Sequence, residues 1–126
     1  MLINFTNHSS SNWSAEQRSV ATDAFGSIVD IPFPEVDPAV GSNQIIDIAE
    51  TQVAKISALS PDAVLCQGEF SLAFAVAALL IKKGIKVVCA CSERNVMETI
   101  DNDGNAVKKA VFKFVRFREY KLPNRA

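Results

Sequence analysis

The sequence predicts an α/β fold in which helices cover a mainly parallel sheet and a β-hairpin follows. Short apolar runs alternate with segments of helical periodicity over residues 2–91, a pattern typical of parallel strands joined by right-handed crossovers. The last third breaks this alternation with two strand-like runs around a turn-rich segment at residues 101–104. With 126 residues, 48% of them hydrophobic, the chain is long enough for one domain with a buried core.

Four parallel strands are predicted from short apolar runs that end at polar, glycine or proline residues. They are expected at Leu2–Phe5, Ser27–Pro32, Ala63–Cys66 and Ile85–Cys91. Between them lie three predicted helices. Ser14 and Gln17 have the spacing of a capping box at the start of the first helix, and Gly26 ends it. Ser42 can cap the second helix, and residues 70–83 form a third that is apolar nearly all round.

The C-terminal third predicts an antiparallel β-hairpin from Val96–Ile100 and Val107–Phe117, joined by the turn at residues 101–104. Its second strand is expected at the edge of the sheet. Residues 1–120 are therefore predicted to form a single Rossmann-like α/β domain, a three-layer sandwich with a sheet of four mainly parallel strands and the C-terminal hairpin. Residues 121–126 are expected to be a flexible tail.

Charge is distributed unevenly along the chain. The net charge of −1 offers no global attraction to nucleic acid or to an anionic membrane. The first half is acidic and the segment from Arg94 onward is basic, which indicates an anion-binding face, self-association or a solvated basic hairpin. Arg116 and Arg118 alternate with Phe117, and such a stripe either binds nucleic acid or protects an edge strand from aggregation.

The three cysteines, Cys66, Cys89 and Cys91, all lie in apolar runs and are expected to be buried thiols in a reducing compartment. Because the chain has one histidine and a metal site needs about four ligands, neither a metal nor another cofactor is expected. The start of the chain lacks the features of a signal peptide, and the apolar stretch at residues 70–81 is too short to cross a bilayer. A cytoplasmic location without a membrane partner is the expectation.

The functional site is expected at the carboxyl ends of the parallel strands, where an open α/β sheet leaves a crevice. Three loops are predicted to meet there: residues 6–12, residues 67–71 and residues 92–94. The candidate ligand-binding residues are Thr6, Asn7, Ser9, Ser10, Gln67, Gly68, Glu69, Ser71, Ser92 and Glu93, and the catalytic candidates are His8 and Arg94.

Each candidate also has an ordinary structural interpretation. His8 titrates near neutral pH and suits acid or base catalysis, yet a loop histidine is often simply solvated. Gly68 permits close approach of a phosphate to a helix N-terminus, whereas Glu69 opposes an anion and can instead complement the helix dipole. Arg94 could bind a phosphate or pair with a neighbouring glutamate. Neither a P-loop nor a G-x-G-x-x-G motif is present, which disfavours nucleoside triphosphate hydrolysis and nicotinamide chemistry.

Four segments together resemble small bacterial CRISPR-associated proteins, which are stand-alone, Rossmann-like relatives of the domains that sense cyclic oligoadenylate. The segments are Ile3–His8, Cys66–Phe70, Ala90–Arg94 and Phe112–Tyr120. The resemblance implies a homodimer that binds a cyclic oligoadenylate across its two-fold axis in type III CRISPR antiviral signalling. Some such families are ring nucleases, in which a ribose 2′-hydroxyl attacks the adjacent phosphate without a metal. His8, Ser9, Gln67 and Arg94 lie in the loops that such a reaction would use.

Other functions fit the same residues. The chain could be a non-catalytic module, either a sensor that binds a nucleotide or another phosphate-bearing small molecule, or a protein that contacts a partner through its hairpin. It could also be an enzyme acting on a small nucleotide, with Glu69 or Glu93 as the reacting carboxylate. No long nucleic acid is expected as a partner.

Overall fold

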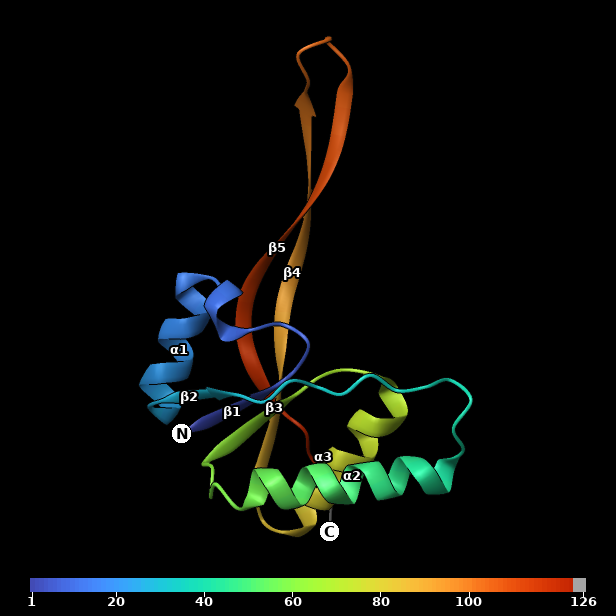
Figure 1. Cartoon of the computed structure of the whole chain (residues 1–126). Coiled ribbons are helices and arrows are strands. Elements are labelled where there is room, and N and C mark those ends of the chain that lie inside the picture. The colour runs from blue at the N-terminus through green and yellow to red at the C-terminus, as the bar shows by residue number, and fades with distance from the viewer. Residues whose placement is uncertain (124–126) are drawn as a thin grey trace.

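The computed structural model describes residues 1–123, in which five strands form one mixed sheet (Figure 1). The elements are β1 (Leu2–Phe5), the short 3-10 helix η1 (Ser10–Asn12), α1 (Ala15–Phe25), β2 (Ile28–Asp30), α2 (Ser42–Ser57), β3 (Ala63–Cys66), α3 (Phe70–Lys82), β4 (Lys86–Ile100) and β5 (Ala106–Glu119). The strand order is β2-β1-β3-β4-β5, with β5 antiparallel to β4 and the other neighbours parallel. The predicted α/β class and the mainly parallel sheet are confirmed.

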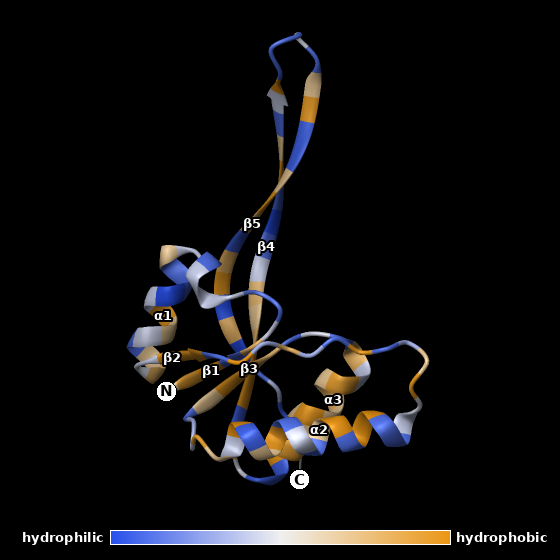
Figure 2. Cartoon of the chain, viewed as in Figure 1, coloured by the Kyte–Doolittle hydropathy of each residue, from blue (hydrophilic) through white to orange (hydrophobic). Residues whose placement is uncertain are grey.

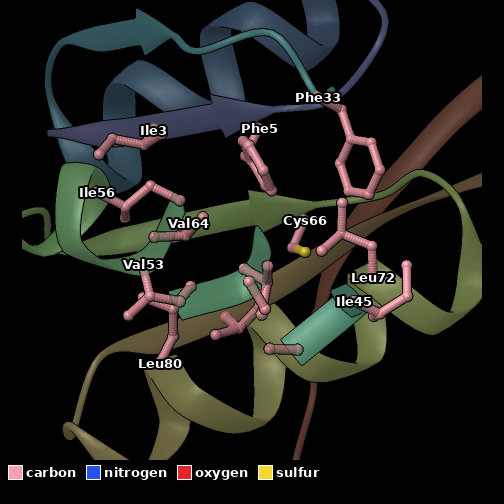
Figure 3. Close-up of a cluster of buried hydrophobic side chains, with 14 residues drawn as sticks. Ile3, Phe5, Phe33, Ile45, Val53, Ile56, Val64, Cys66, Leu72 and Leu80 are labelled. Carbon is pink, nitrogen blue, oxygen red and sulfur yellow. The ribbon is translucent and has the colours of Figure 1, made fainter. Parts of the chain in front are cut away.

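Helices cover both faces of the sheet because alternate residues of each strand point to opposite sides. Ile3, Phe5 and Val64 face α2 and α3, where they belong to the larger buried cluster (Figure 3). Leu2 and Leu65 face α1, in a smaller cluster. All eight residues of β1 and β3 are buried, as expected for strands at the centre of a sheet that is covered on both faces.

Both predicted ends of α1 are confirmed, and the predicted N-terminal cap of α2 is wrong. The Ser14 hydroxyl accepts a hydrogen bond from the Gln17 N–H at 3.1 Å and caps α1, and Gly26 ends that helix with a φ of 83°. Ser42 is the first residue of α2 and not its cap. Gly41 holds the cap position, because the Gln44 side-chain oxygen accepts from the Gly41 N–H at 2.8 Å.

The predicted division between a fourth parallel strand and a separate hairpin is wrong. Residues 86–100 form one strand, β4, which pairs with β5 from Val88↔Glu119 to Ile100↔Ala106. The polar residues at 92–94 do not form a loop, because β5 gives their backbone groups hydrogen-bond partners that a loop would lack. Ser92, Glu93 and Arg94 therefore lie inside β4.

The far part of this strand pair extends away from the body of the molecule as a twisted two-stranded ribbon (Figure 1). We call residues 92–113 the arm; every one of them is exposed. The arm begins at a β-bulge, where Cys91 pairs with Arg116 and the next residue, Ser92, pairs with Phe114. The extra residue in β5 shifts its alternation, so that Phe114 and Phe117 lie on the same face with ring centroids 5.0 Å apart.

The expected tail is described only in part. The Tyr120 N–H donates to the Val87 carbonyl at 2.8 Å, which holds the chain to the sheet just before residues 121–126. Residues 124–126 of the predicted tail lie outside the described residues. Within residues 1–123, no helix combines the length and the apolar character needed to cross a membrane.

Candidate functional site

A cavity of about 540 Å³ lies beyond the carboxyl ends of β1 and β3. Since α1 covers one face of the sheet and α2 and α3 cover the other, the crossovers diverge between these two strands and leave a crevice. We call this cavity the pocket. It is lined by Thr6, Asn7, His8, Asn12, Trp13, Ser14, Gln17, Leu65, Gln67, Gly68, Ala90, Ser92, Phe112 and Phe114.

A buried hydrogen-bond network fixes the loop that carries His8. The side-chain nitrogen of Asn4 donates to the His8 carbonyl at 2.7 Å and to Asp30 Oδ1 at 2.8 Å. Asn4 Oδ1 accepts from the Thr6 hydroxyl at 2.8 Å, and that hydroxyl accepts from the His8 N–H at 3.1 Å. The backbone of His8 is therefore held on both sides, while its imidazole is exposed at the pocket.

Asp30 extends this network to the serine-rich part of the loop. The Ser10 hydroxyl donates to Asp30 Oδ2 at 2.9 Å, and the Ser10 N–H donates to Asp30 Oδ1 at 3.1 Å. Partial burial opposes ionisation of Asp30, but the hydrogen bonds from Asn4 and Ser10 outweigh it and lower the pKa of this carboxyl. Ser10 thus serves to hold the loop, and it does not line the pocket.

Gln67 bridges two strands at the floor of the pocket. Its Oε1 accepts from the Ala90 N–H at 2.6 Å, beyond the last parallel pair of β3 and β4 at Leu65↔Val88. Gln67 Nε2 donates to no atom of residues 1–123, so the two N–H groups of this amide are available to a ligand.

Gly68 is required by packing. A Cβ atom at this position would lie 2.5 Å from Cε1 of Phe33, whose ring is buried against Phe5 at a centroid distance of 4.9 Å (Figure 3). The Phe33 ring therefore fills the space beside the Gly68 backbone that a phosphate was expected to approach. The same glycine also lines the pocket.

The predicted anion site at the start of α3 is occupied by Glu69. Its carboxylate accepts from the Ser71 and Leu72 N–H groups at 3.1 and 2.8 Å and from the Ser71 hydroxyl at 2.7 Å. The Ser71 hydroxyl and these N–H groups lower the pKa of Glu69, so the helix start is already capped by a negative charge. Glu69 and Ser71 do not line the pocket, and this helix end is a poor phosphate site.

The structure brings together six of the twelve predicted site residues. Thr6, Asn7, His8, Gln67, Gly68 and Ser92 line the pocket. Ser9 caps η1. The Ser10 hydroxyl binds Asp30, and the Ser71 hydroxyl binds Glu69. Glu93 and Arg94 lie in the arm, opposite Lys113 and Phe112, and do not line the pocket.

Sequence reasoning missed the aromatic walls of the pocket. Trp13 enters from the segment between η1 and α1, and Phe112 and Phe114 enter from β5 across the sheet. Asn12, Ser14, Gln17, Ala90 and Leu65 were also missed. The only available signal was the position of Trp13 directly after the serine-rich loop. The aromatic residues of β5 could not be placed, because their faces depend on the bulge.

Electrostatically the pocket is neutral. Among residues 1–123, its lining includes no Lys, Arg, Asp or Glu, and His8 is its one imidazole. The lining instead combines amides and hydroxyls with three aromatic rings. Such a surface offers stacking and hydrogen bonds to a flat polar ring, but no direct ion pair to a phosphate.

The cysteines are remote from this chemistry. Burial raises the pKa of Cys66 to about 12 and keeps it a neutral thiol, whose Sγ lies 3.7 Å from the Ala73 carbonyl. Cys89 and Cys91 are half-buried in β4, on the face opposite Ala90 and Ser92. Residues 1–123 contain no group of three or more His, Cys, Asp or Glu side chains arranged to hold a metal ion.

The fold and the pocket define a small α/β protein with a polar, aromatic-walled cavity at the carboxyl edge of its sheet. More specifically, the chain belongs to the uncharacterized protein MJ1673 family, whose model matches residues 1–118. That match covers the whole sheet except the last residue of β5, and the whole pocket. No curated protein matches the sequence.

Proposed function

We propose that the pocket binds a nucleotide through its base, and that the ligand is a cyclic oligoadenylate of type III CRISPR antiviral signalling. The observation that carries this proposal is that Trp13 and Phe112 lie at the same cavity as the side chains of Asn7, His8 and Gln67. Support for the particular ligand comes from the resemblance of the sequence to CRISPR-associated proteins. The strand order and the two-sided helix layers support a Rossmann-like fold as part of the proposal.

The aromatic rings supply the affinity in this proposal. Phe112 is 67% exposed although it lines a pocket, so its ring has a free face. Stacking of a base on such a ring contributes about 1–3 kcal/mol. The free amide of Gln67 and the side chain of Asn7 can then read the polar edge of the base.

The size of the pocket favours one nucleotide unit in each chain. A volume of about 540 Å³ lies in the range of small-ligand sites and is too small for a whole ring of nucleotides. A symmetric ring therefore needs the same pocket from a second chain, which is the reason to propose a homodimer. The phosphates remain at the solvent edge in this arrangement, because no cationic side chain of residues 1–123 lines the pocket.

We further propose that the bound cyclic oligoadenylate is cleaved at the pocket. The 2′-oxygen of a ribose attacks phosphorus, the bond to the 5′-oxygen breaks, and the products are a 2′,3′-cyclic phosphate and a 5′-hydroxyl. His8 accepts the proton of the 2′-hydroxyl, and water protonates the leaving oxygen. Arg94 is no longer a candidate for charge stabilisation within one chain, since it lies in the arm outside the pocket.

Calorimetric titration with a panel of cyclic oligoadenylates, in excess chelator, tests the binding. Phe112→Ala is expected to weaken binding about 5- to 150-fold through lost stacking, and sedimentation of the same variant separates this loss from a change in self-association. Phe74→Ala is the matched control, because Phe74 is 77% exposed and lies on α3 outside the pocket. His8→Ala is expected to retain binding and to lose cleavage. Equal affinity of the wild type and Phe112→Ala would contradict the proposed base site.

A protein-interaction module is the second candidate, and the arm favours it. An exposed ribbon of this length that carries apolar side chains is unusual unless it meets a partner. Absence of any nucleotide binding in the titration would leave this function as the better one.

A further inference from the structure

The arm lacks the support that stabilises the rest of the sheet. No helix covers residues 92–113, and a two-stranded hairpin alone is marginally stable in water. Nevertheless the arm carries large apolar side chains in the open: Val96 is 57% exposed, Met97 54%, Phe112 67% and Ile100 77%. Hydrophobic segments alternate with hydrophilic ones along its whole length (Figure 2). Burial of these apolar side chains against a partner surface would be favourable.

The pairing register divides the arm into two faces, because directly opposed residues of an antiparallel pair point to the same side. The Val96 face consists of Arg94, Val96, Glu98 and Ile100 from β4, with Phe112, Ala110, Lys108 and Ala106 from β5. The Met97 face consists of Glu93, Asn95, Met97 and Thr99, with Lys113, Val111, Lys109 and Val107. The Val96 face continues from Ser92 and Phe114, which line the pocket.

The charges of the arm favour a second copy over a polyanion. Residues 92–113 carry the acids Glu93, Glu98, Asp101 and Asp103 and the bases Arg94, Lys108, Lys109 and Lys113, so the net charge is zero. Glu98 lies opposite Lys108, and Glu93 lies opposite Lys113. A neutral surface with charges of both signs gains little from a nucleic acid backbone. The same surface is compatible with an antiparallel copy of itself.

We infer that two copies of the chain associate by packing the Val96 faces of their arms antiparallel around a two-fold axis at Val96. About this axis, Arg94 meets the partner's Glu98, and the Phe112 ring meets the partner's Lys108. An axis at Arg94 or at Glu98 would instead place like charges against each other. Because the ribbon of each chain twists (Figure 1), the two arms would coil around one another in this dimer.

This interface brings the tip of each arm to the pocket of the other copy. With the axis at Val96, Ile100 lies opposite the partner's Ser92, at the rim of the partner's pocket. The turn at residues 101–105 then covers that rim. A role for the turn in covering a bound nucleotide rests on the proposed function, whereas the interface itself does not.

Sedimentation of the full chain without nucleotide tests the interface. We expect the wild type to be a dimer, Val96→Lys to be a monomer, and Met97→Lys to remain a dimer. The two variants are matched, because neighbouring residues of similar exposure receive the same charge on opposite faces. A monomeric wild type, or a dimer that responds equally to both substitutions, would overturn the inference. Trp13 fluorescence checks that the body of each variant is folded.

Cross-linking tests the axis without introducing a charge into the interface. In a variant with Cys89 and Cys91 replaced by serine, Val96→Cys should link to itself in the partner through a short bis-maleimide, whereas Met97→Cys should not. Links from Met97→Cys alone, or from neither variant in a sedimenting dimer, would overturn the proposed face. Failure of nucleotide binding would leave both of these results unchanged.

Discussion

The side-chain amide of Asn4 donates to the main-chain carbonyl of His8 at 2.7 Å. Through this bond a buried residue of β1 sets the path of the loop at the pocket. Asn4 is only 1% exposed and also holds Asp30 and Thr6, so one side chain links two strands and the loop. Loop geometry at the pocket therefore depends on a buried residue that does not line the pocket.

Replacing Asn4 by Leu should destabilise the protein by about 1–3 kcal/mol, because Thr6 and the His8 carbonyl lose their partner in a buried place. Urea unfolding measures this change. The exposed Asn7→Ala variant is the control and should change the stability by less than about 0.5 kcal/mol. An unchanged midpoint for Asn4→Leu would show that the network is energetically neutral.

The contribution of Asp30 should depend on pH. The pKa of Asp30 is lowered in the folded protein from its ordinary value of 3.8, so folding favours the charged form. The stabilisation is thus complete above pH 3.8 and is lost as the pH falls through the lower pKa of the folded state. Asp30→Asn should cost only about 1 kcal/mol at pH 7, because Asp30 is mostly exposed and solvent screens its charge, and the difference from wild type should shrink in acid.

Thermal unfolding of both proteins between pH 7 and pH 2.5 measures the Asp30 effect. A difference in stability that stays constant across this range would contradict the ionisation argument, even if Asp30→Asn is destabilising at pH 7.

Gly68→Ala should destabilise the protein by roughly 1–3 kcal/mol through overpacking. The new methyl group would collide with the Phe33 ring, which is 4% exposed and cannot swing into solvent. Phe33→Leu removes the ring and should recover part of the loss in the double variant. Additive effects of the two substitutions would show that they do not collide.

Cys66 should resist alkylation in the native protein. Its pKa of about 12 leaves almost no thiolate at pH 8, and the thiolate is the reactive form. Iodoacetamide followed by peptide mass spectrometry should find Cys66 unmodified until the chain is unfolded. Rapid native labelling of Cys66, with Cys89 and Cys91 as internal references, would indicate that the interior opens at this place.

The parallel part of the fold was predictable from local signals. Apolar runs located β1 and β3, and Ser14 and Gly26 marked the two ends of α1. Ser42 was misplaced by one residue, because a glycine with a reaching glutamine can replace a hydroxyl cap. The sheet edge that carries the pocket followed from the same alternation.

The continuous β4 was not predictable from its own residues. Ser92-Glu93-Arg94-Asn95 is polar and exposed, which is typical of a loop, and only the pairing with β5 makes it a strand. The aromatic wall depends on the same pairing, because the bulge decides which β5 side chains face the pocket. Likewise, the sequence left two interpretations of the start of α3 open, a phosphate site or a helix end complemented by Glu69, and only the structure shows Glu69 as the cap.

Equilibrium binding of cyclic oligoadenylates of several ring sizes to the wild-type chain, in excess chelator, tests the central proposal most directly. The proposed base site predicts saturable binding with one ring for two chains, and the exposed imidazole of His8 predicts slow cleavage that chelator does not stop. Absence of binding to every ring, from a folded protein, would contradict a nucleotide function for the pocket.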